Sequence, residues 1–472
     1  MDPRYPKTYV FRWISPIGDS LKIIIATLPI TGRTNPALNV GSILVKAGHE
    51  VVFTSGQSFR ARAESCGLRF ISSPASGTED MLDVNSRFPE RNRIPVGPDR
   101  ALFDFKNVFC DPIPAQYQGL LSILETYPVD VIMADNLFGG ILPFLLKRNA
   151  RPLIVGLGVN PLLFHRDDHA PFGLGLPPVD PASPAAETYL RIAEDVDAKL
   201  THPLRTYVDE ILQKLEVGPL PMSLLDSLVV LPDLFLQLGS PSVEIPRADL
   251  PETVHIVGVL PPFTKGVLPK EIQPFLESGK PIIAVTQGTL ANHELDQVLQ
   301  PTLDALAERD NLLVIGTTGG RPVSTLERAL PKNAMVFSYL PWDEMLEHAS
   351  AFVTNGGFGS VCRALGLGLP MVIAGKGEDK ADVAMRVAHA GAGIDLRTDR
   401  PTPETLQNAI DAVLKEGSSY KLRSREIADE LARIDTSTKI VELLQSAVDA
   451  QLGYELAHLP EAPVSFTENT NA

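Results

Sequence analysis

Short apolar runs alternate with amphipathic stretches along most of the chain. The runs are too short for helices and suit buried strands. They lie at residues 21–27, 51–54, 129–134, 152–156, 281–285, 312–316, 335–337, 351–353 and 371–374. Because helical patterns separate them, the order strand, helix, strand recurs in both halves of the chain. This order predicts an α/β fold in which parallel sheets are covered by helices.

Several helices carry start signals. After the first run we expect a loop at 29–35 and a helix at 36–47, with Pro36 in its first turn. Thr402 is the candidate N-cap of a later helix. Residues 440–448 place apolar side chains on one face, which predicts an amphipathic helix near the end of the chain.

The chain is long enough for two domains, since 472 residues exceed what one hydrophobic core usually holds. Proline interrupts residues 247–268, the best candidate linker. Segments 73–112 and 160–184 are expected as long loops on the ligand side of the first domain. The predicted division is an extension at 1–20, Rossmann-like domains at 21–246 and 269–439, a helix at 440–458 and a flexible tail at 459–472.

The charge balance narrows the class of partner. With 57 acidic and 42 basic residues the net charge is −15, which argues against nucleic acid or an anionic membrane surface as the main partner. Cys66, Cys110 and Cys362 lack the spacing of a metal site, and their odd number suits a reducing compartment. We find neither a signal-peptide h-region nor an apolar run of membrane-spanning length. A cytoplasmic protein that binds small molecules is the expectation.

A glycine-rich turn suggests a phosphate site. The strand at 351–353 runs into Thr354-Asn355-Gly356-Gly357, after which residues 358–367 suit a helix. Free N–H groups and the positive end of the helix dipole favour a phosphate there without a metal ion, and Ser360 adds a hydroxyl donor. The alternative is an ordinary tight turn between a strand and a helix. No P-loop motif is present.

The next strand, at 370–374, delivers Glu378, Asp379 and Lys380 to its carboxyl end, where open α/β sheets bind ligands. A carboxylate at such a position suits sugar hydroxyls.

Together these residues resemble a known family, the family 1, nucleotide-sugar-dependent glycosyltransferases of GT-B fold. The resemblance is to the bacterial and fungal branch that glycosylates small natural products. The donor motif of that family has the form W-x-P-Q, then T-H-x-G-x-x-S, then P and D-Q. Here it is similar to Y339-L-P-W342, T354-N-G-G-F-G-S360, P370 and E378-D-K380. Residues 165–178 are similar to a loop common in this branch. The resemblance covers nearly the whole chain and implies two Rossmann-like domains that face a central cleft, with the last helix packing back on the first domain.

The resemblance also implies a donor site in the second half. Tyr339 takes the place of the aromatic residue on which the nucleotide base stacks, Trp342 that of the glutamine, and Asn355 that of the phosphate histidine. Arg363 stands where a glutamate usually holds the ribose, and this exchange of an acceptor for a cation leaves the ribose contact and the nucleotide open. The remaining expected donor residues are Gly356, Gly357, Gly359, Ser360, Glu378, Asp379, Lys380, Gln287 and Thr289. For the last two, in a loop at a strand end, an ordinary turn is the favoured alternative.

The family's catalytic histidine, in a loop after the first strand, is replaced by Arg33, while the aspartate that orients it is matched by Asp135. Arginine stays protonated and cannot act as general base. Three hypotheses follow. Another group takes the proton, namely Asp135, His165 or His169; or the acceptor is already an anion held by Arg33; or the protein binds its ligands without transferring sugar.

By resemblance we expect an inverting, metal-independent transfer of a hexose from a nucleoside-diphosphate sugar, foremost a UDP-glucose-like donor. The acceptor is expected to be a small hydrophobic natural product with a hydroxyl, phenol or carboxylate. No further cofactor is expected, and a monomer is favoured. The alternatives are a sugar-nucleotide-binding pseudo-enzyme and, within enzymes, a sugar-nucleotide epimerase, for which no Glu-rich catalytic constellation is evident.

Overall fold

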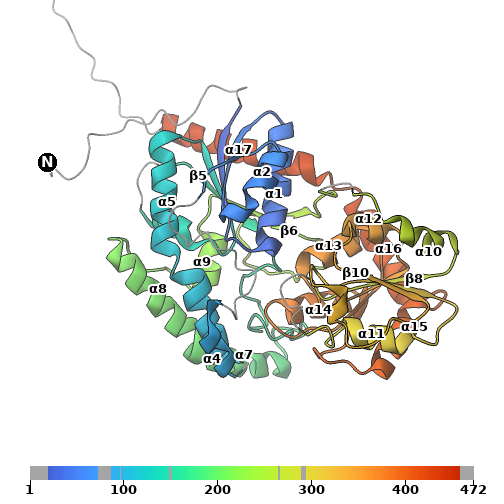
Figure 1. Cartoon of the computed structure of the whole chain (residues 1–472). Coiled ribbons are helices and arrows are strands. Elements are labelled where there is room, and N and C mark those ends of the chain that lie inside the picture. Colours follow the sequence, from blue (N-terminus) through green and yellow to red (C-terminus); the bar gives the residue numbers. More distant parts are fainter. Residues whose placement is uncertain are drawn as a thin grey trace, which may run out of the picture.

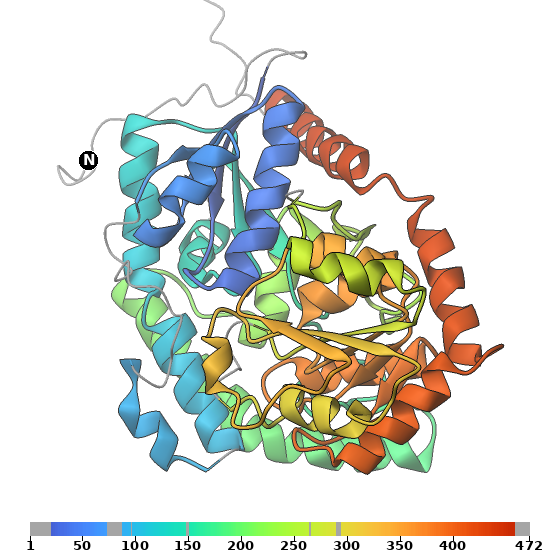
Figure 2. The same cartoon turned by 45° about the vertical axis from the view of Figure 1, so that its right-hand side comes forward.

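The chain folds into two α/β domains, each a parallel sheet with helices on both faces (Figure 1). Figure 2 shows the last helices running along the outside of the second lobe toward the first. The computed structural model describes residues 20–72, 87–95, 97–147, 151–263, 266–288 and 294–457. The expected N-terminal extension, apart from Ser20, and the expected tail lie outside these residues.

The first sheet has the strand order β3-β2-β1-β4-β5-β6-β7, and every pairing between its named strands is parallel. Its strands are β1 (Lys22–Ala26), β2 (Glu50–Thr54), β3 (Arg69–Phe70), β4 (Val131–Asp135), β5 (Leu153–Gly158), β6 (Leu234–Leu238) and β7 (Val254–Gly258). Helices cover both faces, so the central strands are buried on both sides, which explains their continuous apolar runs.

The helices of this domain separate into two layers. Helix α1 (Thr31–Lys46) and α2 (Arg60–Ser65) cover one face, whereas α5 (Ile113–Thr126), α6 (Leu142–Leu146), α8 (His202–Lys214) and α9 (Leu224–Val230) cover the other. Shorter or peripheral helices complete the domain: η1 (Gln57–Phe59), η2 (Pro89–Arg93), α4 (Pro98–Asp104), η3 (Phe105–Cys110), η4 (Gly139–Ile141), α7 (Pro184–Val196) and η5 (Asp197–Thr201).

The second sheet has the order β10-β9-β8-β11-β12-β13 and is also parallel. Its strands are β8 (Ile282–Thr286), β9 (Leu313–Thr317), β10 (Ala334–Phe337), β11 (Ala351–Thr354), β12 (Met371–Ile373) and β13 (Gly393–Asp395). Helices α11 (Leu299–Leu306) and α15 (Pro403–Leu414) pack on one face, and α13 (Phe358–Gly366), α14 (Lys380–His389) and α16 (Ser419–Leu431) on the other. The smaller elements are η6 (Lys270–Ile272), α10 (Gln273–Glu277), η7 (Val323–Thr325) and α12 (Trp342–Glu347).

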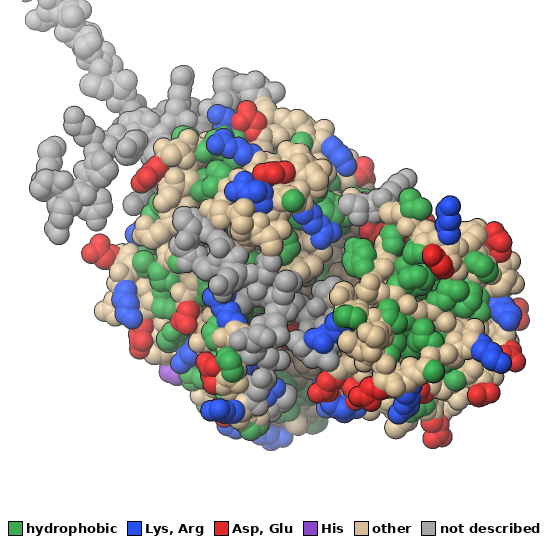
Figure 3. All heavy atoms as spheres, in the orientation of Figure 1, with side chains coloured by type: hydrophobic (Ala, Val, Ile, Leu, Met, Phe, Trp, Pro, Cys, Tyr) green, Lys and Arg blue, Asp and Glu red, His purple; other side chains and the backbone are tan. Residues whose placement is uncertain are grey.

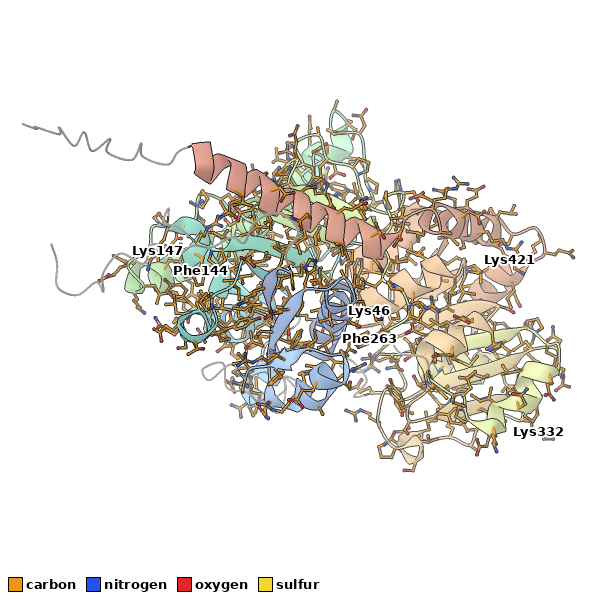
Figure 4. All side chains as sticks on the ribbon, turned by 90° about the horizontal axis from the view of Figure 1, so that it is seen from above. Lys46, Phe144, Lys147, Phe263, Lys332 and Lys421 are labelled. Carbon is orange, nitrogen blue, oxygen red and sulfur yellow. The ribbon has the colours of Figure 1, made fainter. Side chains whose placement is uncertain are left out.

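The last helix, α17 (Thr436–Ala457), leaves the second domain and crosses to the first. Its residues Ile440, Leu444 and Val448 are buried in the core that α1 and the first sheet share. Figure 4 shows this helix lying across the first domain, while Lys332 and Lys421 mark the far end of the second. The expected amphipathic helix is therefore present, and its apolar face joins the two halves of the chain.

Helix α1 begins earlier than the sequence predicts. The carbonyl of Ile30 accepts from the backbone N–H of Arg33 (2.9 Å) and of Thr34 (2.8 Å), so the expected loop at 29–35 is already helical from Thr31. Pro36 consequently lies inside the helix and not in its first turn. The prediction was wrong because a proline is tolerated near the start of a helix. Pro36 has no backbone N–H, so little more is lost there than one hydrogen bond to the carbonyl of Gly32. This shift places Arg33 on the helix.

Two other expectations changed. The expected linker contains β7, which pairs with β6, because the prolines that suggested a linker only flank a short strand. The expected loop at 73–112 contains η2, α4 and η3; Pro98 starts a helix there instead of breaking one. Residues 160–183, by contrast, contain no helix or strand, as expected. Thr402 caps α15 through its side-chain oxygen, as its position predicted.

Candidate functional site

Each sheet has a point where the strand order reverses, and the two points face each other. In the first sheet the reversal lies between β1 and β4, and in the second between β8 and β11. Ligands of open α/β sheets bind at the carboxyl ends of strands at such points. Asp135 ends β4, and Asn355 follows β11. Both expected halves of the site therefore occupy the place that the fold provides for a ligand.

Arg33 and Asp135 form a buried ion pair at the first reversal point. The Arg33 guanidinium nitrogen Nη1 lies 2.9 Å from Asp135 Oδ1 and 3.2 Å from Asn136 Oδ1. The guanidinium also lies over the ring of Phe109, 5.5 Å from its centroid. Since only 8 % of Arg33 is exposed, its charge is held inside the protein by these partners.

Asp135 is fully buried and hydrogen-bonded at both oxygens. Oδ2 accepts from the backbone N–H of Leu28 (2.8 Å), and Oδ1 accepts from that of Leu137 (3.0 Å) as well as from Arg33. With no exposed surface, Asp135 cannot reach the proton of an acceptor, so it orients Arg33 and is not itself placed as the base.

Asn160 connects the two domains, and the sequence did not single it out. Its Oδ1 accepts from Arg33 Nη2 (2.9 Å), and its Nδ2 donates to Asp379 Oδ2 (2.5 Å) in the second domain. Asn160 stands just beyond β5, at the same edge of the first sheet as Asp135. A polar residue after a buried strand is the signal that could have revealed it.

The glycine-rich turn has the geometry expected of a strand-to-helix connection. Gly356 has φ +93°, a left-handed conformation that favours glycine, and Gly357 precedes the first residue of α13. A Cβ at Gly375 would collide with the carbonyl oxygen of Asn355, so the chain after β12 packs closely behind this turn. The first N–H groups of α13 lack helical partners and follow shortly after the carboxyl end of β11.

Three side chains near this turn already have partners. Asn355 Nδ2 donates to the carbonyl of Gln287 (2.5 Å), and Ser360 Oγ donates to that of Gly357 (3.0 Å). The Gln287 side chain accepts from the N–H groups of Val298 and Leu299, both at 2.9 Å, and thereby caps α11. Gln287 thus contributes its backbone to the turn, and its side chain serves the fold. Thr289 lies outside the described residues.

The three residues expected around the nucleoside lie in three different environments. Tyr339 is 68 % exposed, as a platform for a stacked base requires. Trp342 instead packs against Phe352, with 5.9 Å between ring centroids, in the core beneath α12. Arg363 forms ion pairs with Asp343 (3.2 Å) and Glu347 (2.8 Å), both on α12. Its guanidinium is therefore held by carboxylates of this chain and is not directed at a ribose.

Glu378, Asp379 and Lys380 lie together at the start of α14. Lys380 is buried and forms an ion pair with Glu378. The Lys380 charge lowers the pKa of Glu378 against the effect of its desolvation, and Arg91 and Arg33 act in the same direction. Glu378 has φ +59°, which is uncommon for a residue other than glycine and clusters at functional sites. The expected sugar-binding carboxylates are therefore beside a buried cation.

The two loop histidines differ. His165 contacts Asp249 (2.7 Å) and Asp226 (3.3 Å), both in the first domain. Burial would lower its pKa, but the hydrogen bonds and charges of these aspartates outweigh burial and raise it. His169 is exposed and has φ +63° in the loop that leads toward the second domain. Neither is hydrogen-bonded to Arg33 or Asp135 in the described part of the chain.

The loop at 165–178 docks on α14. An ion pair between Arg166 and Asp168 holds it together, and the backbone N–H of Gly173 donates to Asp382 on α14. Gly175, with φ +58°, leaves no room for a side chain against the carbonyl oxygen of Ala381. This loop, expected on the ligand side, therefore closes one edge of the space between the domains.

A buried ionic cluster lies deeper between the domains. Glu244, from the first domain, accepts from Arg386 of α14 (2.9 Å) and from Arg247 (2.8 Å). A cavity of about 20 Å³ beside it, room for about one water molecule, is lined by side chains of both domains. The cluster fixes how the two halves of the site face each other.

On the face seen in Figure 3, described acidic and basic side chains are interspersed over both lobes. Cys110 and Cys362 are buried, and burial raises the pKa of each thiol to about 12, so both remain unreactive thiols; Cys66 is partly exposed.

No helix in the described residues is long and apolar enough to cross a bilayer.

Comparison with known proteins identifies relatives over most of the chain. Residues 300–447 match the family described as the C-terminal domain of erythromycin biosynthesis protein CIII-like proteins. The chain is 32 % identical to 4'-demethylrebeccamycin synthase of Lentzea aerocolonigenes, over 90 % of this chain and 99 % of that protein. It is also 32 % identical to UDP-glycosyltransferase 2 of Phaeomoniella chlamydospora, over 89 % and 94 %.

Solved structures show the same fold. The glycosyltransferase of kitacinnamycin superposes with a TM-score of 0.67 at 18 % identity, covering 91 % of this chain and 99 % of that one. Spinosyn rhamnosyltransferase SpnG complexed with thymidine diphosphate gives a TM-score of 0.63 at 19 % identity, covering 90 % and 100 %. The fold is therefore GT-B, and the chain belongs to the family 1 glycosyltransferases, in their bacterial and fungal natural-product branch.

Proposed function

We propose that this protein transfers a hexose from a nucleoside-diphosphate sugar, foremost a UDP-glucose-like donor, to a small hydrophobic natural product. The observation that carries the proposal is that the carboxyl edges of the two sheets meet, since the Asn160–Asp379 hydrogen bond joins the segment after β5 to the segment between β12 and α14. Relatives that span nearly the whole chain are named for glycosyl transfer and for UDP-sugars, which supports this donor class.

The donor half supplies a stacking surface and an anion site. The base stacks on the exposed ring of Tyr339, and the diphosphate lies at the start of α13, where Asn355 and backbone N–H groups donate to it. Asp379 and Glu378 face the sugar. Because Arg363 is bound to α12, the ribose contact comes from another group.

The reaction is an inverting displacement at the anomeric carbon. The acceptor oxygen attacks this carbon while the nucleoside diphosphate leaves, and the helix start stabilises the charge that develops on the leaving phosphate without a metal ion. Arg33 acts by holding Asn160 and Asp135, not as a base. Since both terminal nitrogens of Arg33 already have protein partners, a hydroxyl or phenol suits the site better than a carboxylate acceptor.

Thermal-shift titration with UDP-, TDP- and GDP-sugars, followed by product analysis with panels of alcohols, phenols and carboxylic acids, tests the proposal. A donor present at about 100 times its Kd is expected to stabilise the protein by about 2.7 kcal/mol. Lys421→Ala, at the far end of the second domain, serves as control (Figure 4). Stabilisation without turnover on any acceptor would indicate a binding protein, and neither stabilisation nor turnover would overturn the proposal altogether.

A further inference from the structure

We propose that Asp379 is the general base of the transfer, so that the base has moved from the first domain to the second. This inference rests on the proposed function and deepens it. It starts from one observation: Asp379 is the last member of a polar chain that begins at the buried Asp135 and passes through Arg33 and Asn160.

The groups nearest the usual position of the base cannot take a proton. Arg33 is a cation with no acceptor atom. Asp135 is fully buried and accepts three hydrogen bonds. His165 is bound between Asp226 and Asp249, away from this chain of residues. His169 is exposed on its loop and is hydrogen-bonded to neither Arg33 nor Asp135 in the described part of the chain, so a base for the acceptor hydroxyl is sought in the second domain.

The partners of Asn160 fix both the orientation of its amide and the position of Asp379. Arg33 only donates, so the oxygen of the Asn160 amide must face it, and the amide nitrogen must then face Asp379. Asp379 Oδ2 accepts this N–H at 2.5 Å, so the first domain holds one oxygen of the carboxylate in place.

The other oxygen of Asp379 remains available. Oδ1 has no hydrogen-bond donor among the described residues, and the residue is half-buried. The charged groups that interact with Asp379 on its own domain are Lys380 and Asp382, and the opposite domain presents Arg33 through Asn160. One oxygen is thus anchored by Asn160, and we place the acceptor hydroxyl at the second.

The step balances without another reactant. As the acceptor oxygen forms its bond to the anomeric carbon, its proton passes to Asp379 Oδ1. The bond between that carbon and the phosphate oxygen breaks, and its electron pair leaves with the nucleoside diphosphate. Protonated Asp379 then returns its proton to water. In this step Asp379 is the catalytic residue, and Asn160 and Arg33 are positioning residues.

Asp379→Asn keeps the hydrogen-bonding shape and removes the base. For alcohol acceptors we expect kcat to fall by about 10²–10⁴-fold, the usual worth of a general base. Because an acidic nitrophenol gives up its proton without help, its kcat should fall by far less. The KM for the donor sugar should stay within a few-fold, and the acid limb of the kcat profile should disappear. Asp195→Asn, on the exposed side of α7, is the matched control.

Asp379→Ala offers a second measurement, since added formate can replace the missing carboxylate. We expect formate to raise the rate of this variant on alcohol acceptors and to leave wild type unchanged. Asn160→Ala should lower kcat by less than Asp379→Asn does and should retain the acid limb, because the base is present but loosely held. Circular dichroism and thermal melting verify that each variant is folded.

Two results would overturn the inference. Equal losses on alcohols and nitrophenols, with a parallel rise in donor KM and no effect of formate, would make Asp379 a sugar-binding residue only. If wild type transfers sugar to no acceptor, the proposed function fails and this inference with it. The two failures are distinguishable because the first requires an active wild-type enzyme.

Discussion

At the scale of the residue, Arg33 changes what the start of α1 can do. A histidine there would exchange protons, whereas the arginine holds a permanent charge between Asp135, Asn136 and Asn160. The position has become part of a rigid polar chain. In the protein without substrate, replacing Arg33 should therefore change mainly the free energy of unfolding.

Arg33→Ala should destabilise the protein strongly, because it leaves the buried Asp135 carboxylate without its cation. Removing one partner of a buried pair costs about 3–5 kcal/mol. Urea denaturation of Arg33→Ala and of Arg33→Ala/Asp135→Asn measures the effect. The double variant should regain part of the loss, since its amide carries no charge and its single oxygen still accepts from one of the two backbone N–H groups. Equal stabilities for the single and double variants would contradict this account.

Tyr339→Ala should weaken nucleotide binding without changing the stability of the free protein. A stacked base is worth about 1–3 kcal/mol, so Kd for the nucleotide should rise roughly 5- to 150-fold. Isothermal titration calorimetry provides the measurement, and Tyr339→Phe, which keeps the ring, is the control. The ring is 68 % exposed, so the melting temperature without ligand should not move. An unchanged Kd would place the base elsewhere.

At the scale of the element, the turn into α13 depends on glycines of two kinds. At Gly375 a side chain would collide with the backbone of Asn355, while a Cβ at Gly359 meets nothing within 4 Å. Replacing glycine by alanine should therefore lower the stability of the protein at Gly375 and raise it at Gly359, although both residues border the same site.

Gly375→Ala should destabilise the protein by about 1–3 kcal/mol, the usual cost of overpacking, and should weaken donor binding because Asn355 is displaced. Gly359→Ala should instead stabilise α13 by about 0.5–1 kcal/mol, since alanine loses less backbone entropy in a helix. Thermal and urea denaturation of the pair are compared with donor titration. If both variants behave alike, the close packing behind the turn has no energetic role.

The elements that the sequence predicted are those with a local signal. Buried strands such as β1 and β11 appear as apolar runs, and the turn before α13 is indicated by its consecutive glycines in the sequence. Asn160 and the Glu244–Arg386 pair have no such signal, because they depend on segments more than 100 residues apart. The start of α1 was missed since proline was taken as a helix start where the backbone of Ile30 already provided one.

At the scale of the whole molecule, the buried cluster around Glu244 links stability to pH. Desolvation opposes ionisation of Glu244, but the charges of Arg386 and Arg247 outweigh it and lower its pKa from 4.5 to about 2. A carboxylate whose pKa is lowered by folding stabilises the folded state above its unfolded pKa. That contribution is lost as the pH falls through the folded value.

We therefore expect the free energy of unfolding to decrease between pH 4.5 and about 2, with Glu244 contributing on the order of 3 kcal/mol. Asp382, whose pKa burial raises against the charge of Arg386, acts in the opposite sense. Comparison of wild type with Glu244→Gln isolates the effect of Glu244. The variant should be less stable at pH 7, because Arg247 loses its counter-ion and Arg386 keeps only Asp382, and its stability should change less in the acid window. Parallel pH profiles for the two proteins would contradict this assignment.

The docking of the 165–178 loop on α14 limits how the halves of such enzymes can be recombined. Gly173 donates to Asp382, and Gly175 lies directly against the backbone of Ala381, so these four positions form one shape-dependent joint. A chimera that joins the first half of this chain to the second half of a relative needs a carboxylate and a small residue at the two α14 positions. Without them, the exchanged half would fold but would carry its acceptor at the wrong distance from the donor.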